Sequence, residues 1–337
     1  MARSVPTNAE LNTNVVTRLA IVGAGAIGGA IAARLAEAGV DVTAVARHAH
    51  AGAIERDGLV LAEPNRVVTV PVPVVRTVAD LAIDASTMVA LAVKSQDTAS
   101  VLDELSRVAP TNTRVACFQN GVANERTVAE RFPNTYGVVV MMPAAHMEPG
   151  RVEAYASPIP GLFDIGLASG AVDDGARDLA TLLRRGGFDA RAVPNVMRWK
   201  YTKLLMNVGN AVEAMCGHDE AAIELVGRAR SEAVRSFRAA GIDFASSDEE
   251  RERRGDLLQV GEIDGSGRGG GSSWQSLARG LGTIEADALN GEVVRIGAAA
   301  GVPTPVNELV VARANQAAAD RVAPGTVNAT GLLAALP

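Results

Sequence analysis

The feature that most constrains this chain is a glycine pattern close to its N-terminus. An apolar run that begins at Leu19 leads into glycines spaced Gly-x-Gly-x-x-Gly, and an alanine-rich helical pattern follows over residues 30–38. In a strand–turn–helix unit the first glycine permits the tight turn, the second lets the backbone approach a pyrophosphate, and the third lets the helix pack against the sheet. N–H groups at the start of the helix would face the phosphates. The residues expected at such a dinucleotide are Gly23, Gly25, Ala26, Ile27 and Gly28.

The next apolar segment, residues 40–46, indicates which dinucleotide to expect. An acid at the carboxyl end of this strand is typical of NAD sites, where it binds the ribose 2′-hydroxyl. Asp41 stands at the opposite end, and Arg47 follows the strand instead. A guanidinium there suits a 2′-phosphate, which it can bind through charge-assisted hydrogen bonds. We therefore expect NADP(H) as the cofactor, the alternative being that Arg47 is a solvated surface arginine.

The composition narrows the class of partner. The 337 residues carry a net charge of −6 and only 3% aromatic residues, so we expect no nucleic-acid partner. No apolar stretch reaches the ~20 residues that span a bilayer, so we expect no membrane partner. Cys117 and Cys216 form no paired motif, which favours reduced thiols and a cytoplasmic protein. The four histidines lack metal-ligand spacing, so no metal is expected.

The order of segments predicts two domains. The expected fold class is α/β, with a Rossmann-type parallel-sheet domain over residues 18–194 and an all-α domain over residues 195–323. Long helices are predicted over residues 196–216, 221–240, 272–300 and 305–320, and a hairpin-like excursion over 151–155 and 161–165. Residues 1–17 and 324–337 are expected to be flexible tails. Ligands of such sheets bind at the carboxyl ends of the strands, so the site should lie there, against the helical domain.

Two polar side chains follow predicted strands at this edge. Lys94 comes directly after the apolar segment 88–93, and Asn120 follows the segment 114–118. Lys94 could donate to cofactor or substrate oxygens, and Asn120 could bond a ribose or a carbonyl. Each signal is weak alone, because Asn-Gly is also a common turn. Their shared location favours a role for both.

A polar stripe marks the predicted helix that opens the second domain. Lys203, Asn207 and Asn210 stand at i, i+4 and i+7, on one face of a helix whose other positions are largely apolar. Such a stripe should face either water or a ligand. Lys200 lies on nearly the same face, and the residues alone favour neither lysine as a proton donor.

A glycine-rich loop from Asp264 precedes Ser272 and Ser273, either of which could cap the following helix. A continuous helix would separate Ser273 from Glu285 by roughly 18 Å. Glycines at 280 and 282 disfavour helix by about 1 kcal/mol each, so a bend there could turn both side chains into one cleft.

These features together resemble the ketopantoate reductase (2-dehydropantoate 2-reductase) family over nearly the whole chain after Arg18. The resemblance rests on the glycine turn with Arg47, Lys94, Gln119-Asn120-Gly121, Trp199 with Lys203 and Asn207, Ser272-Ser273, residues 283–291 and residues 303–307. It implies that Lys203 is the general acid, which decides between the two lysines. It also implies substrate-binding roles for Asn207 and Ser273, and cofactor and reacting-end roles for Lys94 and Asn120. The resemblance also implies that Glu285 binds substrate and orders the site. We expect Glu285 to be a catalytic residue together with Lys203, as the nearest acid that can hold Lys203 or a substrate hydroxyl.

The chain also departs from the family pattern. The family's second helix asparagine, eight residues after the lysine, is Ala211 here, and Asn210 lies one residue earlier as a substrate-binding candidate. We therefore expect an NADPH-dependent reductase of a 2-oxo acid, with ketopantoate a poorer substrate than another branched 2-oxo acid. The alternatives are an NADP-dependent dehydrogenase or imine reductase of secondary metabolism, and a redox sensor that binds NADP without turnover. The oligomeric state stays open, with a homodimer as the assembly considered.

Overall fold

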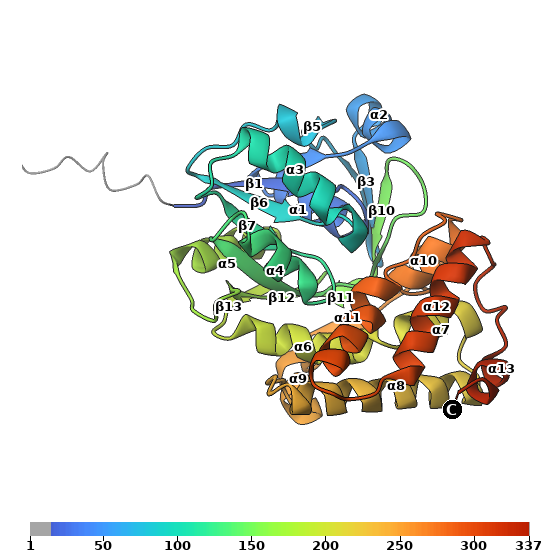
Figure 1. The fold of residues 1–337 in the computed structure, drawn as a ribbon. Helices are drawn as coiled ribbons and strands as arrows, with labels where there is room; N and C mark the ends of the chain where they lie inside the picture. The colour runs from blue at the N-terminus through green and yellow to red at the C-terminus, as the bar shows by residue number, and fades with distance from the viewer. Residues whose placement is uncertain (1–14, 337) are drawn as a thin grey trace, which may run out of the picture.

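The computed structural model describes residues 15–336. Its largest element is an eight-stranded sheet at the N-terminal end of the chain (Figure 1). In spatial order the strands are β13 (Asp189–Ala192), β12 (Leu162–Leu167), β8 (Thr135–Met141), β7 (Arg114–Cys117), β6 (Thr87–Leu91), β1 (Arg18–Val22), β2 (Asp41–Val45) and β5 (Val74–Val75). All neighbours run parallel except β12 and β8. The predicted parallel-sheet domain is confirmed, with two strands reversed at one edge.

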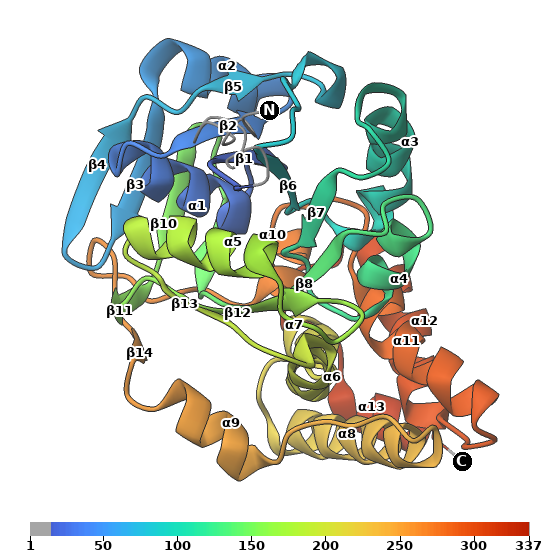
Figure 2. The ribbon, with the colours of Figure 1, turned by 90° about the vertical axis from the view of Figure 1, so that its left-hand side faces the viewer.

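Helices cover both faces of this sheet (Figure 2). Leu19 and Ile21 of β1 pack in the cluster formed with α1 (Ala26–Glu37) and α5 (Asp174–Arg185). Ala20 and Val22 pack in the cluster formed with α3 (Thr98–Val108) and α4 (Ala123–Ala129). Successive side chains of a strand point to opposite faces, so a strand buried on both faces needs an apolar residue at nearly every position. Burial on both faces therefore explains the unbroken apolar runs in the sequence.

A second sheet lies beside the first. Its order is β4 (Arg66–Val70), β3 (Leu59–Glu63), β10 (Arg151–Ala154) and β9 (Ala144–Ala145). The expected hairpin of residues 151–155 and 161–165 is wrong, because β10 pairs with β3 and β9 while β12 pairs with β8 and β13. The helix α2 (His48–Asp57) connects β2 to this second sheet, and short 3-10 turns span Val78–Asp80 and Ser95–Asp97.

The chain beyond residue 194 is mainly helical, which confirms the predicted fold class. Its helices are α6 (Val196–Asn207), α7 (Asn210–Cys216), α8 (Glu220–Ala239), α9 (Ser247–Arg254), α10 (Ser272–Ala278), α11 (Ala286–Ala299), α12 (Pro305–Ala319) and α13 (Ala329–Ala334). Two of the predicted helices, over residues 196–216 and 272–300, are each divided into two. The first is interrupted at Gly209, where any Cβ would lie 2.9 Å from Val226 of α8. The second is interrupted between α10 and α11, where Gly280 and Gly282 adopt positive φ of 58° and 75°.

Two expectations about the helical part need correction. It is not purely α, because β14 (Leu258–Val260) pairs antiparallel with β11 (Ala156–Pro158) of the N-terminal part. The C-terminal segment is not a loose tail in its described residues. There Asn328 caps α13 through a hydrogen bond from Gly331 N, and Leu332 is buried in the core shared with α7, α8 and α12. The cap and this apolar packing, to which Ala329, Leu333 and Leu336 also contribute, both stabilise the short helix.

The predicted N-terminal tail falls largely on residues 1–14, outside the described residues. Val16 is buried, and its N–H donates to Asp178 Oδ2 at 2.9 Å. Within residues 15–336, no helix is both long and apolar enough to cross a bilayer. Cys117 and Cys216 are buried and unpaired. Across the same residues, no three His, Cys, Asp or Glu side chains gather as metal ligands.

Candidate active site

The glycine turn after β1 has the geometry that its sequence predicts. Gly23 has φ +105°, and a Cβ there would lie 2.9 Å from the backbone nitrogen of Val93. A Cβ at Gly28 would collide with the Gly23 carbonyl, so the third glycine lets α1 approach the sheet. By contrast, nothing lies within 4 Å of a Cβ built at Gly25. No side chain caps the first turn of α1, so its first N–H groups have no side-chain acceptor. The turn therefore has the form of a phosphate cradle.

A cavity of about 720 Å³ opens above this turn, between the carboxyl ends of the strands and the helical part. Its volume is within the range of roughly 300–1,000 Å³ that small-molecule and cofactor sites occupy. The predicted site residues that line it are Gly23, Gly25, Ala26, Ile27, Arg47, Lys94, Asn120, Lys203, Asn207, Asn210 and Glu285. Two predicted residues do not line it: Gly28, which packs beneath the turn, and Ser273.

Arg47 lies at the end of the cavity next to the glycine turn. It follows β2 and precedes α2, while the Val45 carbonyl accepts hydrogen bonds from Gly23 N and Ala24 N. The Arg47 side chain is 48% exposed, and its guanidinium is 4.0 Å from a Glu104 carboxylate oxygen. A half-exposed guanidinium with one long ion pair can turn toward an anion placed over α1.

Lys94 and Glu285 form an ion pair across the cavity, with Nζ 2.8 Å from Oε2. The other carboxylate oxygen of Glu285 accepts hydrogen bonds from Ser95 N and Oγ at 3.1 and 3.2 Å. Burial works to raise the pKa of Glu285, but the charge of Lys94 and the Ser95 hydrogen bonds outweigh it and leave that pKa lowered. Glu285 therefore holds Lys94 and joins α11 to the sheet. The sequence suggested a contact between Glu285 and Lys203, but the carboxylate binds Lys94 instead.

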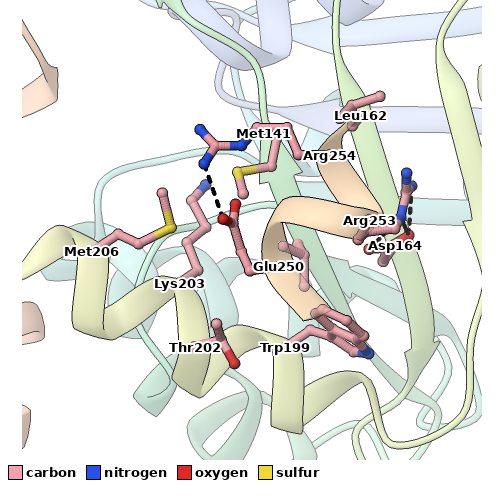
Figure 3. A pocket seen from close by; sticks show the side chains of 11 residues that line it. Met141, Leu162, Asp164, Trp199, Thr202, Lys203, Met206, Glu250, Arg253 and Arg254 are labelled. Carbon is pink, nitrogen blue, oxygen red and sulfur yellow. Dashed lines mark hydrogen bonds and ion pairs between the residues drawn. The ribbon is translucent and has the colours of Figure 1, made fainter. Parts of the chain in front are cut away.

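Lys203 reaches the same cavity from α6. Its Nζ donates to the Val140 carbonyl at the end of β8. Figure 3 shows the side chain beside Met206 and Met141, with the Glu250–Arg254 ion pair of α9 alongside. The stem of Lys203 also borders a second cavity of only about 20 Å³, enough for about one water.

The surroundings of the Lys203 amine disfavour its charged form. Burial, then the nearby charges of Lys200 and Arg268, lower the pKa of Lys203 to about 7. Asn207 presents a buried amide nitrogen, Nδ2, that has no hydrogen-bond partner. Asn210 follows on α7 and lines the cavity as well. The predicted stripe therefore faces the cavity, although two helices carry it instead of one.

Lys200, the competing lysine, lies elsewhere. Its side chain is 3% exposed and ion-pairs with Glu125 of α4, which is 2% exposed. Nζ also donates to the Gln119 carbonyl at 2.9 Å, so Lys200 supports the turn that carries Asn120. Positions three apart lie about 60° from each other on a helix, so the two lysines start on adjacent parts of one face and their long side chains reach different partners.

The serine pair differs from its expected arrangement. Neither serine caps α10, whose N-cap is Gly271. Ser272 lines the cavity, while Ser273 is 1% exposed and absent from the lining, and both hydroxyls lack hydrogen-bond partners. A contact between Ser273 and a substrate therefore stays a prediction. Gln275, which the sequence did not single out, donates to the Ala144 carbonyl at 3.0 Å and ties α10 to the sheet side.

Two histidines lie at the site: His50, which the sequence placed either at the adenine end of the cofactor or, as the favoured alternative, in a loop without a role, and His146, which the sequence did not single out. His50 and His146 line the cavity with ring centroids 4.2 Å apart. His50 Nε2 lies 2.7 Å from the Ala24 carbonyl, and its Nδ1 accepts from Gly150 N at 2.9 Å. Burial, then His50 and Arg279, lower the pKa of His146 to about 4, so the pair is neutral near pH 7. His50 and His146 are 96 positions apart in the sequence, so no local pattern indicates that their rings are in contact.

The fold and site define a two-part α/β protein, in which a dinucleotide-type turn faces a lysine from a helical region. The family model described as "Ketopantoate reductase PanE/ApbA" matches residues 19–169. The model described as its C-terminal part matches residues 195–318. The chain belongs to the ketopantoate reductase family.

Individual relatives agree with this assignment. A 2-dehydropantoate 2-reductase from Caulobacter vibrioides is 30% identical over 320 residues, which cover 90% of this chain and 100% of the relative. A crystal structure of a PanE/ApbA family ketopantoate reductase from Ralstonia eutropha JMP134 has 27% identity and a TM-score of 0.75, covering 90% of this chain and 99% of its own. D-mandelate dehydrogenase, solved with NADH and anilino(oxo)acetate, shares the fold at 22% identity and a TM-score of 0.74, covering 90% and 98% of the two chains.

Proposed function

We propose that this protein is an NADPH-dependent reductase that converts a 2-oxo acid into the corresponding 2-hydroxy acid, by chemistry of the 2-dehydropantoate 2-reductase type. The observation that carries the proposal is the position of Lys203, whose amine shares one cavity with the glycine turn and has a pKa lowered to about 7. A group whose pKa lies near the working pH is suited to general acid catalysis. The names of the relatives support the same reaction class.

The residues of the sheet side fit a nicotinamide dinucleotide. Open space over Gly25 and the uncapped start of α1 suit a pyrophosphate. Arg47, at the carboxyl end of β2, suits a 2′-phosphate and supports NADPH over NADH. Lys94 and Asn120 would contact the ribose and the reacting end. When bound, the reduced nicotinamide supplies the hydride for a carbonyl carbon.

The residues of the helical side would act on the substrate carbonyl. Lys203 donates a hydrogen bond to the carbonyl oxygen and gives it a proton as negative charge develops there. The Val140 carbonyl holds the amine in place between turnovers. Asn207 Nδ2, buried without a partner, donates to a second substrate oxygen, since an unsatisfied buried donor favours a ligand that supplies an acceptor. Asn210 extends this contact along the cavity.

Glu285 acts through Lys94. Their ion pair connects α11 to the turn after β6, so it fixes the width of the cavity at the reacting end. Gln96 adds a parallel link, since its amide nitrogen lies 3.3 Å from Thr283 Oγ1. We assign Glu285 as a positioning residue for the reaction, rather than the direct partner of Lys203.

Oxidation of NADPH in the presence of a panel of carbonyl compounds tests the proposal. We expect turnover of branched 2-oxo acids, faster than of their amides or esters, and slower use of NADH. Ketopantoate should be a poorer substrate than 3-methyl-2-oxobutanoate, because Ala211 is buried and only Asn210 reaches the cavity. A kcat/KM for ketopantoate above about 10⁴ M⁻¹s⁻¹ would contradict that ranking. Binding of NADPH without oxidation by any 2-oxo acid would favour a sensor.

A further inference from the structure

One arginine in the cavity has no role in the reaction derived so far. Arg268 lies in the glycine-rich loop between β14 and α10 and lines the cavity together with Lys203 and Ser272. Its neighbours Gly267 and Gly269 are exposed, whereas the Arg268 side chain is partly buried. Its Nε is fully buried and has no hydrogen-bond partner. The loop therefore turns this side chain inward, although solvent lies on the other side.

The charges around Arg268 are not balanced. Three other cations near the cavity have carboxylate partners: Lys94 with Glu285, Arg254 with Glu250 and Lys200 with Glu125. Within the described part of the chain, Arg268 and Lys203 form no ion pair, and Arg268 forms no hydrogen bond either.

Arg268 also acts on the charge of Lys203. Arg268 is close enough to lower the pKa of Lys203, and burial lowers the pKa of Arg268 itself. Lys203 and Arg268 are thus two partly buried cations of the cavity without a carboxylate partner among the described residues, while Arg279, which also has none, is exposed at its lining. An uncompensated buried charge is unfavourable, so an anionic ligand is the physical complement of this end of the cavity.

We propose that Arg268 is the specificity-determining residue that binds the substrate carboxylate, with the adjacent 2-oxo group directed at Lys203. The planar guanidinium fork matches a carboxylate in two parallel hydrogen bonds, which a hydroxyl cannot do. The two Nη groups, which form no hydrogen bond to the described residues and are not fully buried, supply these donors. This inference rests on the proposed function and names the group that selects acids over amides. Ser272 lines the same cavity, whereas Ser273 does not.

The test compares Arg268→Gln and Arg268→Lys with Arg251→Gln. Arg251 is a matched control, because it carries the same charge and lies on α9 with a side chain 75% exposed. Substrates are 3-methyl-2-oxobutanoate and its amide. A second measurement, independent of turnover, is the affinity for oxamate, an unreactive 2-oxo acid analogue, in the presence of NADP⁺. Thermal unfolding and NADPH affinity report whether each variant is folded and binds cofactor.

We expect Arg268→Gln to raise KM for the acid and weaken oxamate binding by roughly 10²-fold, as loss of one partner of a charged hydrogen-bonded pair does. The kcat for the acid, the kinetics with the amide and the affinity for NADPH should change little. Arg268→Lys should lie between wild type and Arg268→Gln, and Arg251→Gln should match wild type. Unchanged acid KM and oxamate affinity in Arg268→Gln, or equal losses for acid and amide, would overturn the inference.

Failure of the proposed function gives a different pattern. If the wild type binds oxamate through Arg268 but oxidises no NADPH with any 2-oxo acid, the anion subsite stands and the reductase assignment is wrong. If the wild type turns over 2-oxo acids but does not bind oxamate, the inference about Arg268 is overturned while the reductase assignment stands.

Discussion

Two lysines three residues apart on α6 have opposite surroundings. Lys200 is buried against Glu125 of α4 and the Gln119 carbonyl. Lys203 lines the cavity, has only the Val140 carbonyl as a partner among the described residues and lies near Arg268, which has no carboxylate partner there either. The comparison distinguishes a lysine with a structural role from one available for chemistry. A buried cation with a carboxylate partner braces the fold, whereas one without a partner has a shifted pKa and is available for a ligand or a proton.

The largest effect should come from removing the unpaired lysine. We predict that Lys203→Ala lowers kcat by roughly 10²–10⁴, the usual contribution of a positioned general acid. The affinity for NADPH, measured by fluorescence titration, should be retained, because the glycine turn and Arg47 lie at the other end of the cavity. A kcat within a few-fold of wild type would remove Lys203 from the mechanism.

The paired lysine should matter for stability instead. We predict that Lys200→Ala lowers the free energy of unfolding by about 3–5 kcal/mol, because it leaves Glu125 buried without its partner. The double variant Lys200→Met/Glu125→Leu should recover part of this loss in denaturant titrations. The loss of kcat per folded molecule should be much smaller than in Lys203→Ala. If the two lysines show the reverse effects, the comparison between them is wrong.

A third prediction concerns the cofactor end of the cavity. Arg47→Asp should raise KM for NADPH by roughly 10–10²-fold, the equivalent of one charge-assisted hydrogen bond, and change KM for NADH far less. Arg107→Asp on α3 makes the same charge change at an exposed position outside the cavity and is the control. Equal affinity of the wild-type protein for the two cofactors would count against the role of Arg47.

The smallest effect is a shift in pH dependence. Lys203 must be protonated to act, so kcat/KM should be level below about pH 7 and fall as the amine deprotonates above its pKa of about 7. Arg268→Gln removes a cation that lowers this pKa, so the falling limb should move to higher pH. Lys200 stays in place, and the Glu250–Arg254 pair beside Lys203 is already neutralised. A limb that moves to lower pH would show that Arg268 does not act on Lys203.

Local patterns predicted the glycine turn well, because the positive φ of Gly23 and the contact of Gly28 with the Gly23 carbonyl involve residues close in sequence. The close approach of Gly23 to Val93 is a tertiary contact that the pattern did not indicate. The serine pair shows the limit of such reasoning. A one-residue difference on α10 decides that Ser272 faces the cavity and Ser273 does not, and a sequence pattern does not fix the rotation of a short helix.

By itself, the sequence determined the parallel sheet, the dinucleotide-type turn and the polar stripe of Lys203, Asn207 and Asn210, since apolar periodicity and glycine spacing are local properties. Only the tertiary structure decided which charges meet. It paired Glu285 with Lys94 and Lys200 with Glu125, and left Arg268 unpaired beside Lys203. The physical reason is that ion pairs between residues far apart in the chain depend on how the helical part packs against the sheet.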